Sequence, residues 1–125
     1  MKTKKQILNK KVTEAFVKKN TWFSGTTRMN LGWGNGYVVI PKGHKLHGKS
    51  YDEIHNLIPS LRVNGGLTFS KDANNLDWDE LPENSKDGWV VGFDTAHYGD
   101  TFERWSKENV IAEAEKLKKQ LEKYV

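Results

Sequence analysis

The segment Trp89–Phe93 restricts the possible folds of this chain more than any other segment. Its sequence, Trp-Val-Val-Gly-Phe, is apolar at nearly every position, whereas a strand with one face in water alternates apolar and polar side chains. Such a run is typical of a strand covered on both faces, so it predicts a sheet with other structure packed on each side. The chain has 125 residues, which is enough for one core of this kind and too few for two.

Helical periodicity is found near both ends of the chain. Residues 4–19 carry apolar side chains at helical spacing between lysines, namely Ile7, Leu8, Val12, Ala15 and Phe16. Residues 106–125 carry a second apolar stripe, made of Val110, Ala114, Leu117, Leu121 and Tyr124. Each pattern predicts an amphipathic helix that lies on a sheet. The spacing of the C-terminal stripe also suits a partner helix, so a homodimer through this helix is a second possibility.

A hairpin is predicted in the first half of the chain. Residues 26–33 and 37–40 have strand-like composition, and Gly34-Asn35-Gly36 between them is a strong turn signal because glycine and asparagine tolerate positive φ. Pro41 is expected to end the second strand, since proline has no amide hydrogen to donate to a sheet.

A short helix and a further strand are predicted next. Ser50 and Glu53 match a capping box, in which two side chains satisfy free amides at a helix start, so a helix should follow over residues 51–57. Residues 61–63 and 66–70 are predicted as strand, separated by paired glycines.

These elements predict an α+β fold with a mostly antiparallel sheet packed with N- and C-terminal amphipathic helices. We expect a single domain over residues 1–125, in which 1–20 is a basic N-terminal helix, 21–105 the sheet core and 106–125 the C-terminal helix. Within the core, residues 71–88 are rich in Asp, Glu and Asn, which favours an acidic surface loop.

The composition excludes several classes of function. The chain has no cysteine, so disulfides, thiolate catalysis and cysteine-bound zinc are excluded. Its longest apolar runs, such as residues 37–41, are far too short to cross a bilayer. We therefore expect a cytoplasmic protein with no membrane partner.

Positive charge is concentrated at the N-terminus. Residues 1–19 hold seven lysines against one acidic residue, Glu14. A basic helix of this kind can contact nucleic acid or an acidic partner, although charge runs more often form a solvated helix face.

The best candidate for a functional site follows the central strand. Asp94, His97 and Asp100 are a histidine and two carboxylates, flanked by Gly92 and Gly99, which would allow tight turns. A carboxylate can orient an imidazole for general acid–base catalysis, with His97 and Asp94 as the catalytic candidates, and two carboxylates can bind a divalent ion. The same spacing also arises where Asp94 and Asp100 are turn or cap residues and His97 bonds to the main chain.

His44 and His47 lie in a lysine-rich loop after the predicted hairpin. They would join this cluster if the loop lay near the end of the central strand. Two histidines three residues apart on a loop are weak evidence for a metal site, and ordinary surface histidines explain them as well.

The turn Asn64-Gly65-Gly66 and the nearby Thr68 are candidate ligand contacts. Paired glycines expose backbone amides that can receive a phosphate or carboxylate oxygen, but the segment lacks the lysine and the spacing of a P-loop. A β-bulge is the structural alternative. One or two of the five tryptophans are expected to form a stacking wall beside the site.

The order of these motifs resembles a family of small uncharacterised proteins of phages and bacterial prophages. The likeness covers about residues 30 to 105 and is carried by Gly36-Tyr37-Val38-Val39-Ile40-Pro41, Gly43-His44, Tyr51-Asp52, Gly65-Gly66-Leu67-Thr68-Phe69-Ser70, Gly92-Phe93-Asp94, Ala96-His97 and Gly99-Asp100. In that family's pattern a histidine precedes the paired glycines, whereas Asn64 stands there in this chain, which weakens a metal-centred interpretation. The resemblance implies an accessory phage protein that acts on a host defence, and it implies no particular reaction.

Three hypotheses of function follow. The first is a binding protein that holds a small anionic or nucleotide-like ligand, or a host defence protein, in a pocket formed by the strand ends. The residues expected to line this pocket are His44, Asn64, Gly65, Gly66, Thr68, Asp94, His97 and Asp100. The second is a small hydrolase that uses His97 and Asp94, with or without a metal ion. The third is nucleic-acid binding through the basic N-terminal helix.

Overall fold

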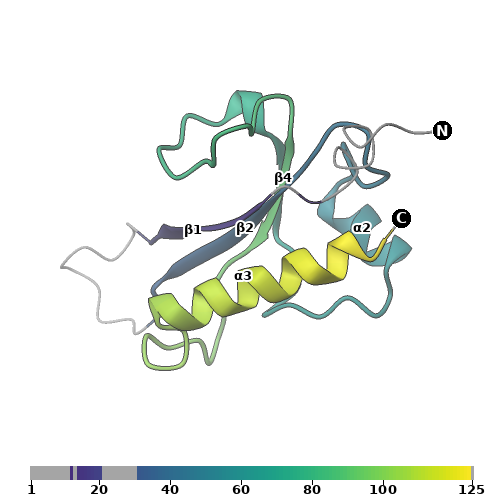
Figure 1. The fold of residues 1–125 in the computed structure, drawn as a ribbon. Coiled ribbons are helices and arrows are strands. Elements are labelled where there is room, and N and C mark those ends of the chain that lie inside the picture. Colours follow the sequence, from purple (N-terminus) through teal and green to yellow (C-terminus); the bar gives the residue numbers. More distant parts are fainter. Residues whose placement is uncertain (1–11, 13, 21–30, 125) are drawn as a thin grey trace.

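The computed structural model describes residues 12, 14–20 and 31–124. Its sheet contains four strands, β1 (Glu14–Lys19), β2 (Gly34–Ile40), β3 (Phe69–Asp72) and β4 (Trp89–Phe93), in the order β1-β2-β4-β3. All neighbouring strands are antiparallel. The described residues also form two helices, α2 (Tyr51–Leu57) and α3 (Lys107–Glu122), and a short 3-10 turn, η1 (Ala73–Asn75) (Figure 1). The predicted α+β class with an antiparallel sheet is confirmed.

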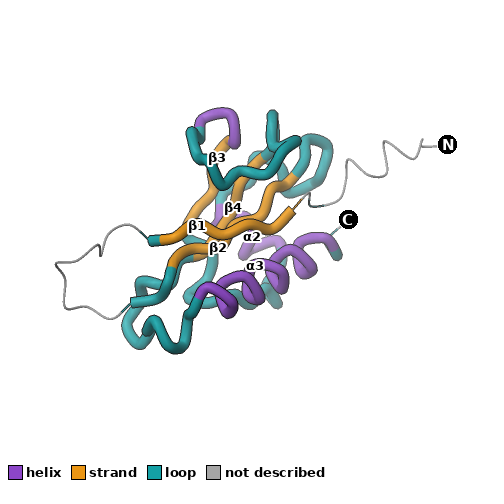
Figure 2. The backbone as a smooth tube through the Cα atoms, turned by 60° about the vertical axis from the view of Figure 1, so that its left-hand side comes forward, coloured by secondary structure: helices purple, strands orange, loops and turns teal. Residues whose placement is uncertain are grey.

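The sheet is covered on both faces. Helices α2 and α3 lie on one side, and the loop that contains η1 lies on the other (Figures 1 and 2). Val91 belongs to the apolar cluster under α3, whereas Val90 belongs to the cluster on the opposite face. Both valines are fully buried. The prediction that β4 is a central strand is therefore confirmed.

The helix predictions near residues 50 and 110 are confirmed. Ser50 and Glu53 form the complete capping box at the start of α2. In α3 four residues of the predicted stripe are buried against the sheet, namely Val110, Ala114, Leu117 and Leu121. The stripe that also suited a partner helix is thus used within the chain. Within the described residues, no helix combines the length and the apolar character needed to cross a bilayer.

The prediction of a helix over residues 4–19 is wrong for residues 14–19, which form β1. Cross-strand pairs such as Phe16 with Tyr37 and Lys18 with Asn35 place it at the edge of the sheet beside β2. The exposed edge of β2 supplies hydrogen-bond partners that a helix would have to find within itself, so pairing overrides the helical spacing. Residues 4–11 and 13, with most of the basic segment, lie outside the described residues.

The predicted turn at Gly34-Asn35-Gly36 is also wrong, because these residues begin β2. Gly34 and Gly36 are extended and do not use positive φ. They are needed for space, since a Cβ on Gly36 would collide with the Phe93 ring and one on Gly34 with the Lys18 carbonyl. In the other predicted strand of this hairpin, residues 26–30 lie outside the described residues and 31–33 form no strand.

The strand predicted over residues 61–70 is confirmed only at its end. Residues 61–68 are irregular, and β3 begins at Phe69. Gly65 and Gly66 have φ of +67° and +79°, a conformation that interrupts a strand. The predicted acidic loop 71–88 is confirmed after η1, whereas its first residues belong to β3 and η1.

Candidate functional site

The chain leaves the sheet after β4 in a turn stabilised by local hydrogen bonds. Asp94 Oδ1 accepts a bond from the amide of Ala96 at 3.0 Å, and the amide of Asp100 donates to the His97 carbonyl at 2.9 Å. Fully buried Thr95 donates its hydroxyl to the Gly34 carbonyl at 2.6 Å and so ties the turn to the start of β2. These contacts bring Asp94, His97 and Asp100 together, and they make the two aspartates turn residues at the same time.

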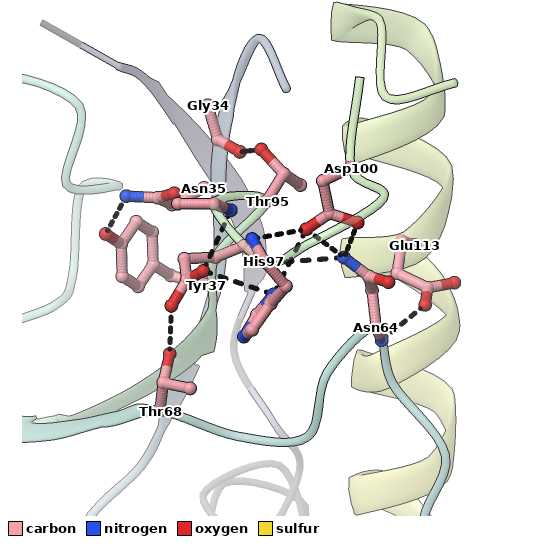
Figure 3. Close-up of polar contacts among 11 residues, drawn as sticks. Gly34, Asn35, Tyr37, Asn64, Thr68, Thr95, His97, Asp100 and Glu113 are labelled. Atoms are coloured by element: carbon pink, nitrogen blue, oxygen red, sulfur yellow. Dashed lines mark hydrogen bonds and ion pairs between the residues drawn. The ribbon is translucent and has the colours of Figure 1, made fainter. Parts of the chain in front are cut away.

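Both carboxylates contact the same nitrogen of the His97 ring, and Figure 3 shows the contact with Asp100. Its Nδ1 lies 3.1 Å from Asp100 Oδ2 and 3.4 Å from Asp94 Oδ1. Asp100 is nearly buried, with 6% of its surface exposed, and also accepts a bond from the His97 amide at 2.9 Å. No described residue bonds to Nε2 of His97, and about a third of the side chain is exposed. The ring is therefore oriented through Nδ1, which leaves Nε2 for a ligand or solvent.

Asn64 joins the paired-glycine turn to this cluster. Its side-chain Nδ2 donates to both carboxylate oxygens of Asp100, at 3.2 Å each. Its backbone amide donates to Glu113 Oε2 of α3 at 2.8 Å. The His97 ring lies against Gly65, since a Cβ there would be 2.6 Å from its Nε2 and 2.7 Å from its Nδ1. The structure thus brings together Asn64, Gly65, Asp94, His97 and Asp100, as expected from the sequence.

The other residue of the glycine pair and its neighbour have different surroundings. Gly66 lies beside His55, whose Nε2 accepts a bond from the Leu67 amide at 2.9 Å, so this histidine is structural. Thr68 donates its hydroxyl to Asp94 Oδ2 at 2.9 Å. Thr68 therefore connects the turn after β4 to the strand-like segment that enters β3.

The expectation that His44 joins the cluster is wrong. Its loop follows the end of β2, and Ile40 at that end pairs with Trp89 at the start of β4. Since His97 follows the other end of β4, the two histidines lie at opposite ends of the sheet. The His44 ring is buried, and its Nδ1 accepts a bond from the Leu46 amide at 3.1 Å. Its Nε2 has no hydrogen-bond partner of good geometry in the part of the chain that the structure describes. Burial lowers the pKa of His44.

A metal-binding role of the cluster finds no support in this geometry. The part of the chain that the structure describes contains no group of three His, Asp or Glu side chains arranged to hold a metal ion. The oxygens of Asp94 and Asp100 instead accept hydrogen bonds from neighbouring amide, hydroxyl and imidazole groups.

A cleft of about 320 Å³ adjoins the cluster. Asp94 and Thr68 belong to both. The cleft lies on the face of the sheet opposite α3, because Tyr37, Phe69 and Trp78, which line it, belong to the apolar cluster of that face. Phe93 of β4 also lines it. The rings of Tyr37, Phe69 and Trp78 pack together, with centroid distances of 4.8 Å between Tyr37 and Trp78 and 5.4 Å between Phe69 and each of the other two.

The opposite rim of the cleft is polar and carries two lysines. It is formed by Lys18, Lys19, Asn20 and Asn35. The ammonium of Lys18 lies 5.5 Å from the centre of the Trp78 ring and 3.4 Å from Glu80 Oε2. Two buried amide atoms on this rim, Nδ2 of Asn20 and Oδ1 of Asn35, have no hydrogen-bond partner among the described residues.

Gly92 makes room for the aromatic wall. It was expected to supply a tight turn, but it is extended within β4, opposite Tyr37. A Cβ there would collide with the Tyr37 ring, so only glycine lets this ring lie flat on the sheet. Burial raises the pKa of the Tyr37 phenol, with smaller contributions from the charges of Asp94 and Glu80, so it remains a neutral hydroxyl that accepts a bond from Asn35 Nδ2 at 3.3 Å.

Sequence reasoning missed the residues that β1 and β2 contribute to the cleft. Lys18 and Asn35 are cross-strand partners, but their segments have the local signals of a helix and of a turn. No local pattern could have placed them together. Of the tryptophans in the described residues, Trp78 lines the cleft as a wall residue, whereas Trp33, Trp89 and Trp105 pack against the core under α3.

Comparison with known proteins gives no related protein from which the role of this site could be inferred. No protein-family model matches the chain, and neither a curated protein nor a solved structure is significantly similar to it.

Proposed function

We propose that this protein binds a small anionic ligand in the cleft beside Trp78 and acts by holding it. The observation that supports this most strongly is the meeting of aromatic rings and the Lys18 ammonium group in one concave site. Ligand pockets commonly combine apolar walls with a few polar groups that set the orientation of the ligand. Such a protein needs shape and hydrogen bonds but no nucleophile.

The hydrogen-bonded turn after β4 supports the same proposal. Asp94 reaches the edge of the cleft, and its carboxylate is fixed there by Thr68 and by the amide of Ala96. His97 and Asp100 brace the turn behind it. A carboxylate held in advance loses little conformational freedom when it accepts a bond from a ligand, which favours affinity.

The resemblance of the motifs to a phage protein family suggests in which biological process this binding takes place. We propose that the protein is a phage-type accessory protein that sequesters a small molecule used by a host defence. The measurement is phage growth on a defence-active host that expresses the chain. Growth should be restored by the intact protein and should stay restricted if the cleft is blocked. Restoration by a variant without a functional cleft would point instead to a host protein as the target.

Native mass spectrometry tests ligand binding directly. Protein purified from host cells under native conditions should carry an extra mass that is released on denaturation. Replacing Lys18 and Lys19 by Ala should abolish it, because the anion then loses its counter-charges. A matched control replaces Lys42 and Lys45, two exposed lysines at the opposite end of the sheet, and should keep the mass. Loss in both variants, or no retained molecule in any preparation, would contradict the proposal.

Hydrolysis is a second candidate function, and the orientation of His97 favours it. Carboxylates at Nδ1 hold the ring so that Nε2 can exchange a proton with a substrate, which is the arrangement of a general base. Turnover of a labelled nucleotide by the purified protein, lost in His97→Gln, would support this function. Unchanged anti-defence activity in His97→Gln and in the presence of a chelator would exclude it.

A further inference from the structure

The cleft also limits the chemical class of its ligand. We infer, building on the proposed function, that the ligand is a nucleoside monophosphate whose base lies against Trp78 and Phe69 and whose phosphate replaces Glu80 at Lys18. Three features of the cleft support this, namely its size, its rings and the ion pair on its rim.

The size of the cleft selects a small ligand. Its volume of about 320 Å³ is at the lower end of the range of roughly 300–1,000 Å³ that ligand pockets occupy. A single base with one sugar and one phosphate fits this volume better than a dinucleotide or a longer oligonucleotide.

The rings select a flat group. Trp78 and Phe69 line the cleft and are only partly buried, with their centroids 5.4 Å apart, whereas Tyr37 behind them is 5% exposed. Partly exposed rings are available to a base, and stacking on aromatic side chains tolerates any of the four bases. Asp94 and Thr68 stand at the same end of the cleft and offer acceptors to a ribose hydroxyl or an exocyclic amine.

The ion pair on the rim marks the place of the phosphate. Glu80 Oε2 lies 3.4 Å from Lys18 Nζ, and the two side chains are 36% and 31% exposed. Exposed pairs of this kind contribute little to stability and are easily exchanged. A phosphate with two negative charges attracts the lysine about twice as strongly as a carboxylate at the same distance, so it should displace Glu80. Glu80 therefore occupies Lys18 in the free protein and competes with the phosphate of the ligand for it.

Calorimetric titration of the purified full-length chain tests this assignment. The probes are AMP, GMP, CMP and UMP, with adenosine, ribose 5-phosphate and inorganic phosphate as partial ligands. At least one monophosphate should bind about tenfold or more tightly than each partial ligand, because only the complete molecule uses both the rings and the lysine.

Two rim variants separate the parts of the site. Lys18→Ala should weaken binding of the monophosphate about tenfold or more and leave the weaker binding of adenosine unchanged. Glu80→Gln should strengthen monophosphate binding severalfold, since it removes the competing carboxylate. The matched controls are Lys71→Ala and Glu83→Gln, two exposed residues that do not line the cleft, and neither should change the affinity. Trp78→Phe, checked by circular dichroism for intact folding, should weaken the binding of monophosphate and adenosine alike.

The outcomes distinguish the inference from the proposed function. If ribose 5-phosphate or inorganic phosphate binds as tightly as every monophosphate, the inference is overturned while anion binding stands. Monophosphate binding that Lys18→Ala and Glu80→Gln leave unchanged overturns it as well. If none of the probes binds and the protein purified from cells carries no retained molecule, both the inference and the proposed function are wrong.

Discussion

The contact between Gly65 and His97 allows a quantitative test of how the turn cluster is built. Gly65→Ala introduces a methyl group at φ +67°, and this Cβ would lie within 2.7 Å of both nitrogens of the His97 ring. The ring must therefore move away, and its movement breaks the contacts of Nδ1 with Asp100 and Asp94.

The expected cost has two parts. An alanine in the left-handed region costs about 1–2 kcal/mol, of which about 0.4–1 kcal/mol is offset because alanine restricts the unfolded chain. Loss of a hydrogen bond to a charged group adds about 1.5–3 kcal/mol when it is buried, and we take about 1–2 kcal/mol because His97 is one-third exposed. The free energy of unfolding should fall by about 1.5–3 kcal/mol in total.

Urea denaturation of four variants measures these parts separately. Gly99→Ala is the matched control, because Gly99 has φ +90° in the same turn and open space around its Cβ position. It should cost only the conformational part, about 0.5–1 kcal/mol. In a His97→Ala background, Gly65→Ala should cost as little as the control, since the ring that it displaces is absent. The imidazole signals of His97 in NMR spectra should also shift in Gly65→Ala and stay in place in Gly99→Ala.

The reasoning is refuted if Gly65→Ala costs the same with and without His97. Such a result would mean that the backbone conformation alone makes glycine necessary at this position. An unchanged His97 spectrum in Gly65→Ala would lead to the same conclusion.

Three further predictions concern other parts of the fold. The free energy of unfolding should fall as the pH drops below about 6.5, because burial lowers the pKa of His44 and the unfolded chain then binds a proton more readily than the folded chain. His44→Asn keeps an acceptor for the Leu46 amide and should flatten this dependence. Denaturant titrations at several pH values measure it. Ser50→Ala should lower the free energy of unfolding by about 1 kcal/mol through loss of the capping box, which thermal unfolding measures. The control, Glu53→Gln, keeps a side-chain acceptor and should cost less. Asn64→Ala should cost about 2 kcal/mol in urea denaturation, because it removes the donor to a nearly buried carboxylate, and a loss near zero would show that solvent replaces it.

Several elements could be predicted because their signals are local. The capping box at Ser50 needs only residues within one helical turn, and β4 is recognised by its own unbroken apolar run. The turn after β4 is similar, since Asp94, His97 and Asp100 bond mainly within seven residues of chain. The convergence of these three side chains was therefore open to inference from their spacing.

Other features depend on which segments become neighbours. Residues 14–19 have helical spacing, yet they form β1 because β2 offers an unpaired edge. Gly36 and Gly92 have the local signal of turn residues, but their lack of a side chain serves the close approach of Phe93 and Tyr37. His44 was expected to lie near Asp94 and His97, but the antiparallel order of the strands places it at the opposite end of the sheet.

By itself, the sequence determined the class of fold, the central strand, the two described helices and the polar turn, because each has a recognisable signal within its own segment of the chain. Only the tertiary structure decided the edge strand, the roles of the glycines and the cleft. Lys18, Asn35 and Trp78 come from three distant segments and meet through strand register and the path of a loop. Register is set by the packing of the whole sheet, and no short stretch of sequence contains it.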